Sequence, residues 1–203
     1  MYPKFLDEIR RQNGLMMISE IEELVARGNI IFDPFSVLIS SSVEIGSGNT
    51  IFPCVSLICR NDGILTIGDD NTFFSNTQIE ALTGPIQIGS HNLIGEGGFT
   101  AKTNRPDAEI LIGDYGRYQN GVSVFGNTIL GSGSQLLGAL TADSCRLESG
   151  QSFREPDPDL RAGLLKGHGI ARGLSVPVGH VIVGDGRFSS DNLELQTVYH
   201  PKA

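Results

Sequence analysis

The sequence contains no tryptophan, and aromatic residues make up only 7% of its 203 positions. Charged residues are few, at 19%, and 15 Lys and Arg stand against 23 Asp and Glu, a formal net charge of −8. Surfaces that bind nucleic acids or anionic membranes depend on clustered Lys and Arg. We therefore expect no nucleic-acid partner.

Long apolar runs are also missing. No run approaches the ~18 residues that a membrane-spanning helix needs, and the N-terminus lacks the charged-then-apolar pattern of a secretory leader. There are three cysteines, Cys54, Cys59 and Cys145, an odd count that matches no metal-ligand spacing. We expect no membrane span, a cytoplasmic location, reduced thiols and no metal site.

The dominant feature of the chain is an internal repeat. An Ile-Gly or Leu-Gly pair followed by Ser or Asp recurs at intervals of 22, 21, 24 and 18 residues, as Ile45-Gly46-Ser47, Ile67-Gly68-Asp69, Ile88-Gly89-Ser90, Ile112-Gly113-Asp114 and Leu130-Gly131-Ser132. A finer period of six relates the large apolar residues Ile39, Ile45, Ile51, Leu57, then Ile67, Phe73, Ile79, then Ile88, Ile94, then Ile112, Tyr118, Val124, Leu130 and Leu136. Small or β-branched residues follow many of them four positions later: Val43, Val55, Thr77, Thr83, Val122, Thr128 and Ser134.

A period of six is typical of neither a helix, which repeats every 3.6 residues, nor a simple strand, which alternates every two. A parallel β-helix with three short strands per coil produces it, because each hexad supplies one strand and one corner, and stacked coils pair their backbone groups. A β-sandwich is the alternative, but its strands alternate with period two. We expect Gly at the second hexad position, and Asn49, Asn71 and Asn92 near the corners, to occupy turns with positive φ.

With this repeat the chain resembles the LpxA-like hexapeptide-repeat superfamily. The resemblance covers about residues 32–152 and resumes at 176–184, which is similar to the closing coil of many members. It implies an all-β fold: a left-handed parallel β-helix of about six coils with short N-terminal helices and a C-terminal extension. It also implies a homotrimer of parallel prisms. Both the handedness and the trimer come from the resemblance and not from the period.

The expected organisation has five parts. They are an N-terminal helical cap (1–30), the left-handed β-helix (31–153), an excursion with a loop and short helix (154–173), the closing coil (174–188) and a C-terminal tail (189–203). In the cap, Ser19-Glu20-Ile21-Glu22 predicts a capping box at the start of a helix. Leu160, Leu164 and Leu165 before Gly167 predict one or two helical turns in the excursion, and residues 100–111 predict a longer loop within the coil.

Acyltransferases of the superfamily move an acyl group from coenzyme A or acyl carrier protein to a sugar or amine, with histidine as general base. The resemblance implies His91 for this role, as the only histidine within the repeat, although the family's base commonly lies one position earlier, where this chain has Ser90. A polar corner residue is the alternative interpretation of His91. Lys102 and Arg105 are candidates for binding donor phosphates, or are solvated charges. Acyl-CoA or acyl carrier protein would be a co-substrate, and we expect no permanently bound cofactor.

The γ-class carbonic anhydrases are also similar in one place. In those enzymes an Arg-Gly-Asp segment precedes an Ile-x-Ile-Gly turn, and its Arg and Asp bridge subunits. Arg60-Asn61-Asp62 ahead of Leu65-Thr66-Ile67-Gly68 resembles this arrangement. This makes Arg60 and Asp62 interface candidates. Zinc needs three imidazoles, but Glu80, Ser90 and Glu96 stand near the ligand positions, which disfavours zinc carbonic anhydrase.

Non-catalytic relatives form a third branch. Residues 84–94 resemble the Gly-Pro-Ile-x-Ile-Gly-x-x-Asn-Leu-Ile segment of the small pointed-end subunits of dynactin, which use the prism as a rigid assembly surface. Outward-pointing Phe52 and Phe74 predict an apolar face that packs against a neighbour. The sequence thus favours acyl transfer to a sugar or amine, and the alternative is a trimeric scaffold without catalysis.

Overall fold

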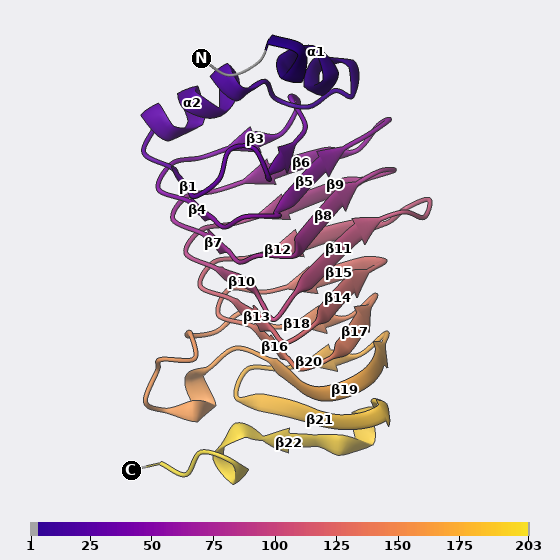
Figure 1. Cartoon of the computed structure of the whole chain (residues 1–203). Helices are drawn as coiled ribbons and strands as arrows, with labels where there is room; N and C mark the ends of the chain where they lie inside the picture. The colour runs from indigo at the N-terminus through magenta and orange to yellow at the C-terminus, as the bar shows by residue number, and fades with distance from the viewer. Residues whose placement is uncertain (1–3, 203) are drawn as a thin grey trace.

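In the computed structural model, which describes residues 4–202, two short helices precede a parallel β-solenoid (Figure 1). Helices α1 (Lys4–Gln12) and α2 (Ile18–Ala26) lie at its N-terminal end. Ile18, Ile21 and Leu24 of α2 are buried and join the core of the coil, so this helix covers backbone groups that an open coil would leave unpaired. Among the described residues no helix is long and apolar enough to cross a membrane.

The start of α2 differs from the predicted capping box. Its N-cap is Met17, and Ser19 lies inside the helix. The Glu20 carboxylate reaches back and accepts a hydrogen bond from the Met17 backbone N–H at 2.6 Å. Asp7 of α1 accepts from the next N–H, that of Ile18, at 2.9 Å. A carboxylate from the neighbouring helix thus contributes to the cap, which local sequence could not show.

The solenoid has three faces, and within each face the strands pair in parallel. The first face holds β3 (Glu44–Ile45), β6 (Ile64–Ile67), β9 (Pro85–Ile88), β12 (Glu109–Ile112), β15 (Asn127–Leu130), β18 (Arg146–Leu147) and β20 (Ser175–Val176). The second holds β1 (Ile30–Ile31), β4 (Thr50–Ile51), β7 (Thr72–Phe73), β10 (Leu93–Glu96), β13 (Arg117–Gln119) and β16 (Gln135–Leu137). The third holds β2 (Leu38–Ile39), β5 (Ser56–Cys59), β8 (Thr77–Ala81), β11 (Phe99–Thr103), β14 (Val122–Phe125) and β17 (Leu140–Asp143).

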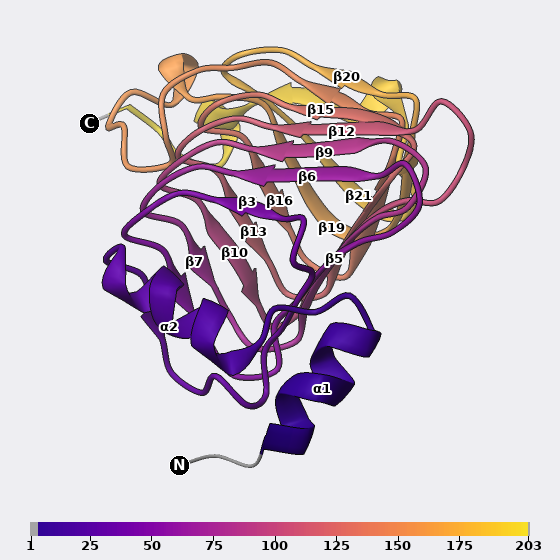
Figure 2. The same cartoon turned by 90° about the horizontal axis from the view of Figure 1, so that it is seen from above.

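The coil is left-handed. Seen from the N-terminal end in Figure 2, the chain passes from β5 to β6 to β7 counter-clockwise while it recedes from the viewer. Parallel strands are usually joined by right-handed connections, so this hand is the exception that the resemblance implied. Strands β1 to β18 form successive groups of three, each group one coil.

The predicted hexad register is confirmed. Every large apolar residue of the period-six series is buried, and Phe73 and Ile79 are fully buried. Six of the seven small positions are also buried. The exception is Thr83, which is exposed and donates through its hydroxyl to the Thr103 and Arg105 carbonyls. The core is therefore a column of aliphatic side chains inside the prism.

The glycines of the Ile-Gly pairs have a different role from the one predicted. Positive φ occurs not at Gly68 or Gly89 but two residues later, at Asp70 and His91. A Cβ at Gly68 would lie 2.8 Å from the Gly89 carbonyl oxygen of the next coil. These glycines are needed because successive coils approach too closely for a side chain, so the positive-φ prediction for the second position was wrong.

The expected loop at 100–111 is shorter than predicted. Strand β11 continues to Thr103 because Ala101 and Thr103 keep the inward alternation, and β12 resumes at Glu109. Only residues 104–108 leave the coil. Lys102 is consequently a strand residue in register with Glu80 on the third face.

The excursion at 154–173 also needs correction. Its only helical element is the short 3-10 turn Pro158–Leu160. Leu164 and Leu165 begin strand β19 (Leu164–Arg172), and Leu165 is buried in register with Leu136. The first half of β19 pairs with β16 and the second half with β17, so the second and third faces merge at this end. Strand β21 (His180–Arg187) pairs along β19, and β22 (Leu193–Leu195) adds antiparallel to β21.

Candidate functional site

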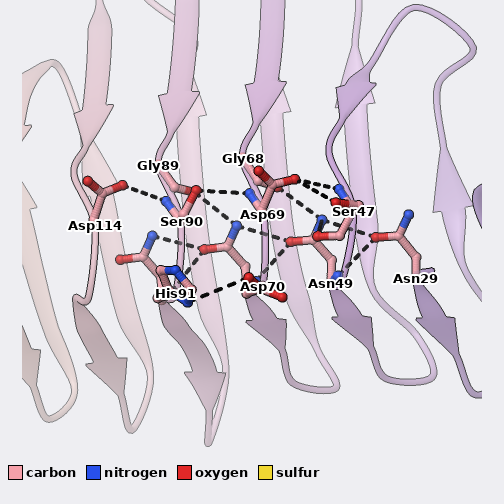
Figure 3. A network of polar contacts seen from close by, with 12 residues as sticks. Asn29, Ser47, Asn49, Gly68, Asp69, Asp70, Gly89, Ser90, His91 and Asp114 are labelled. Atoms are coloured by element: carbon pink, nitrogen blue, oxygen red, sulfur yellow. Dashed lines mark hydrogen bonds and ion pairs between the residues drawn. The ribbon is translucent and has the colours of Figure 1, made fainter. Parts of the chain in front are cut away.

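The corner between the first and second faces carries the most ordered polar groups of the coil (Figure 3). On its outer side Ser and Asp alternate, and each side-chain oxygen accepts from the backbone N–H of the preceding coil. Asp69 accepts from Ser47 at 2.6 Å, Ser90 accepts from Asp69 at 3.0 Å, and Asp114 accepts from Ser90 at 2.7 Å. The hydrogen bonds from Ser47 hold the pKa of Asp69 below its ordinary value. These contacts explain the small or acidic residue after each Ile-Gly pair.

Inside the same corner the asparagines form a second ladder. Asn29, Asn49, Asn71 and Asn92 are buried, and the oxygens of the first three accept from the backbone and the amide of the next asparagine. The oxygen of Asn92 accepts from the Gly116 N–H at 2.7 Å. Their φ values are not positive, so the prediction that they occupy left-handed turns was wrong. They are required because a buried corner N–H needs an acceptor where coils stack.

Between the two ladders, one residue per coil adopts the left-handed conformation. Asp70 (φ 55°), His91 (φ 61°) and Tyr115 (φ 57°) take this position in three successive coils. Non-glycine residues are uncommon there, and Asp and His are among the enriched ones. All three side chains are exposed along one edge of the prism.

His91 is partnered on both sides by these neighbours. Its Nδ1 lies 3.8 Å from Asp70 Oδ2, and its ring stacks on Tyr115 with centroids 4.7 Å apart and planes 10° from parallel. The His91 side chain is 43% exposed. The carboxylate lies at ion-pair distance from one ring nitrogen, and the partly exposed ring can be reached from solvent. The arrangement can accept a proton from a molecule docked on this corner.

The other predicted binding residues lie elsewhere. Lys102 Nζ pairs with Glu80 Oε2 at 3.2 Å on the third face, and Arg105 lies in the 104–108 loop at the corner between the third and first faces. Neither shares a corner with His91. The structure therefore does not bring His91, Lys102 and Arg105 into one site.

Arg105 instead takes part in a clasp around Asp143. The Asp143 carboxylate, 8% exposed, accepts from Arg105 at 2.5 Å and from Arg172 Nε at 3.1 Å. Burial opposes ionisation of this group, but hydrogen bonds from Arg105 and Ser144 and the two nearby guanidinium charges outweigh burial and lower the pKa of Asp143. A Cβ at Gly126 would intrude into the clasp, 2.5 Å from Asp143. The clasp anchors the 104–108 loop to the coil.

The second face carries the predicted aromatic residues. Phe52 and Phe74 stack with centroids 5.2 Å apart, and Phe32 continues the row at 4.8 Å from Phe52. Phe32 is 58% exposed. Arg60 and Asp62 are exposed in the turn between β5 and β6, on another corner. The four interface candidates thus do not form one continuous patch.

One pair of a histidine and an aspartate was not predicted from the sequence. His168 Nε2 lies 2.7 Å from Asp185 Oδ1 because β19 and β21 pair in register. Both side chains are mostly exposed, at 66% and 85%. His168 belongs to the sheet of the solenoid, so His91 is not the only histidine of the coil. The Gly-His-Gly and Gly-Asp-Gly triplets at 167–169 and 184–186 were the available signal.

The thiols and metal ligands are dispersed. Within residues 4–202 no group of three or more His, Cys, Asp and Glu side chains could hold a metal ion. Cys54 is exposed, Cys59 is half-buried and Cys145 is buried, and all three are free. Burial raises the pKa of the Cys59 and Cys145 thiols, which makes both poor nucleophiles.

The core of period six, the three parallel faces and the left-handed winding together decide the fold. It is a left-handed parallel β-helix with a six-residue repeat. No family model matches the chain, and no curated protein matches it. An activity for this protein must be argued from its own residues.

Several solved structures are similar to the hexapeptide-repeat coil. LpxA from Acinetobacter baumannii is 19% identical, with 77% of this chain and 69% of that chain covered and a TM-score of 0.42. A proposed acetyltransferase from Bacillus cereus is 11% identical, with 83% and 82% covered and a TM-score of 0.38. UDP-N-acetylglucosamine O-acyltransferase (LpxA) from Moraxella catarrhalis is 15% identical, with 82% and 71% covered and a TM-score of 0.32. These likenesses concern the coil and assign no activity.

Proposed function

We propose that the protein transfers an acyl group from a thioester donor, acyl-CoA or acyl carrier protein, to a hydroxyl or amine of a sugar or related acceptor. The observation that carries the proposal is the Asp70–His91 pair on an exposed edge of the coil, with Nδ1 3.8 Å from the carboxylate. An imidazole oriented by a carboxylate and open on its other nitrogen is suited to general-base catalysis.

In the proposed reaction His91 Nε2 removes the proton of the acceptor hydroxyl or amine as its oxygen or nitrogen attacks the thioester carbonyl. The new ester or amide bond forms, the carbon–sulfur bond breaks, and the thiolate leaves. His91 then returns the proton to the sulfur, so no oxidant or metal is needed. Asp70 keeps the ring oriented and stabilises the imidazolium formed in between.

A neighbouring copy would complete this site. The edge of His91 borders the second face, on which Phe32, Phe52 and Phe74 form an apolar row. A second prism that covers the row would lie beside His91 and turn the open edge into a cleft. We therefore propose a homotrimer with active sites at the subunit boundaries.

The experiment supplies acetyl-CoA with a panel of amino sugars and nucleotide sugars and follows thiol release. The test variant is His91→Asn, because Asn tolerates the left-handed conformation at this position. Loss of a general base lowers turnover by about 10²–10⁴-fold. His168→Asn, which removes the other carboxylate-paired histidine of the coil, is the matched control and should keep full activity. Full activity in His91→Asn would overturn the assignment of His91.

A second function, a non-catalytic assembly scaffold, is favoured by a different observation. The Phe32–Phe52–Phe74 row is an ordered apolar surface without any catalytic group on it. Failure of the wild type to release thiol from any acceptor, together with the absence of coenzyme A binding in calorimetry, would support the scaffold over the enzyme.

A further inference from the structure

A polar cavity lies on the second face at the C-terminal end of the coil, away from the His91 edge. Its volume is about 440 Å³, within the range of small-molecule sites. Strands β13, β16 and β19 form its floor, the segment around Phe153 and Arg161 forms one wall, and the C-terminal tail forms the other. Four parts of the chain, distant in sequence, thus meet around one space.

The charges that line this cavity are all of one sign. Arg117, Arg161 and Lys166 contribute cations, and His200 adds a third kind of basic group. No carboxylate is among the lining residues, although the whole chain carries a net charge of −8. A cationic cavity in an acidic protein concentrates anions.

The acidic groups nearest to the cavity already have partners. Glu96, whose charge acts on Arg117, accepts a hydrogen bond from Gln119 Nε2. Asp157 and Asp159 both pair with Lys202, at 3.0 and 2.6 Å. Glu96 still acts on the charge of Arg117, and Asp157 interacts with Arg161 as well as with Lys202, but the lining itself keeps an excess of positive charge.

The Arg117 side chain packs on an aromatic ring and carries an unpaired donor. Its guanidinium lies over the Phe153 ring, 4.3 Å from the centroid, and its Nε is buried without an acceptor. Buried N–H groups are nearly always paired, so an orphan donor inside a cationic cavity indicates an acceptor supplied from outside the chain. Burial lowers the pKa of Arg117 from its ordinary value, but a guanidinium remains charged at neutral pH.

The surroundings are rigid enough to preorganise the cavity. Arg161 Nε donates to the Glu155 carbonyl at 2.7 Å, which leaves its terminal nitrogens free to bind. Gln196, fully buried, fastens the tail through its amide to the Ala162 and His180 carbonyls at 2.7 and 3.1 Å. Arg117 and Lys166 lie on strands two apart in the sheet, and Lys166 is two residues beyond Leu164, the residue in register with Arg117, so their backbones are ~12 Å apart.

We infer that this cavity binds the phosphate groups of a small phosphorylated molecule, with Arg117 and Lys166 as the principal ligands. Phosphate offers several charged acceptors for the guanidinium donors and the ammonium group. Because the two cations are carried by separate strands, a diphosphate can contact both of them more readily than a single phosphate can. The inference does not depend on the acyl-transfer proposal, since none of these residues lies at the His91 edge.

The experiment titrates the full chain with inorganic pyrophosphate and with inorganic phosphate at constant ionic strength, by calorimetry. We expect saturable binding with one site per chain and tighter binding of pyrophosphate. Arg117→Gln and Lys166→Gln should each weaken it about 10-fold or more, as expected for a charge-assisted hydrogen bond. Arg187→Gln, which removes the same charge from an exposed arginine outside this cavity, should bind as the wild type does.

Two results would overturn the inference. One is the absence of saturable binding to the wild type up to 10 mM pyrophosphate, a concentration at which ~1 mM affinity would be evident. The other is equal weakening by Arg187→Gln and Arg117→Gln, which would show attraction by net charge alone. Lys166 is exposed, so Lys166→Gln should fold and keep the test valid even if Arg117→Gln does not. Thiol release is not measured, so the outcome is separate from that of the acyl-transfer assay.

Discussion

The side-chain oxygen of Asn49 accepts two hydrogen bonds from Asn71, one from its backbone N–H at 2.9 Å and one from its amide at 3.0 Å. Asn71 repeats the same pair of bonds with Asn92 of the following coil. All three side chains are fully buried. Each asparagine therefore satisfies the corner of the coil above it and the coil below it.

Asn71→Ala should destabilise the coil by about 3 kcal/mol, because it removes the acceptor of two buried donors of Asn92 and the amide that donates to Asn49 Oδ1 and to the Gly89 carbonyl. Urea unfolding followed by circular dichroism measures the change. Gln78→Ala, an exposed change one strand away, should stay within about 0.5 kcal/mol of the wild type. Similar stability of the two variants would contradict a structural role for the asparagine ladder.

Ile79→Ala should lower the free energy of unfolding by about 2–5 kcal/mol, through lost burial and the cavity left inside the prism. Ile79 is fully buried at an inward hexad position. Ser90→Ala should be milder, about 1 kcal/mol, because the lost contact is the hydrogen bond from the Asp69 N–H to Ser90 Oγ. The same urea titration compares them, and equal losses would mean that the inward register is misplaced.

The Asp143 clasp predicts a pH dependence. The folded-state pKa of Asp143 is lowered, so its contribution is present above the unfolded value of about 3.9 and is lost as pH falls through the folded value. Asp143→Asn should therefore be less stable than the wild type at pH 7, and the two should converge as the pH is lowered below about 4. Thermal melting of both proteins from pH 7 to 3 measures the gap. A gap that stays constant over this range would exclude the charge of Asp143 as its cause.

Phe74→Asp tests the apolar row as an interface. The ring points away from the core of its own prism and stacks on Phe52, so a charge here should disrupt association while leaving the coil folded. A stable contact buries more than ~1,000 Å², and we expect the wild type to sediment as a trimer and Phe74→Asp as a monomer in sedimentation velocity. Phe125→Asp, on the third face of the same prism, is the matched control and should leave the assembly intact. A wild type that sediments as a monomer would show that this face is not a self-interface.

The six-residue period is sufficient to predict the solenoid, its three faces and the inward residues. This was possible because in a hexad the direction of a side chain follows from its position in the repeat, and the rule recurs in every coil. Ile79 and Tyr118 could be placed inside the prism for that reason. The exposed edge position of His91 was predictable for the same reason, as was the outward row of Phe52 and Phe74.

Features that depend on distances between coils could not be predicted in this way and are seen only in the folded chain. The Ile-Gly pairs need glycine because the next coil comes close: a Cβ at Gly68 would lie 2.8 Å from a carbonyl oxygen. The φ values of these glycines do not require it. The partners of His91, Asp70 and Tyr115, lie 21 residues before it and 24 residues after it in the sequence. The cavity around Arg117 brings together segments that no repeat relates. Contacts between positions that are not equivalent in the repeat depend on the lengths of the insertions between hexads. A local period carries no information about these lengths.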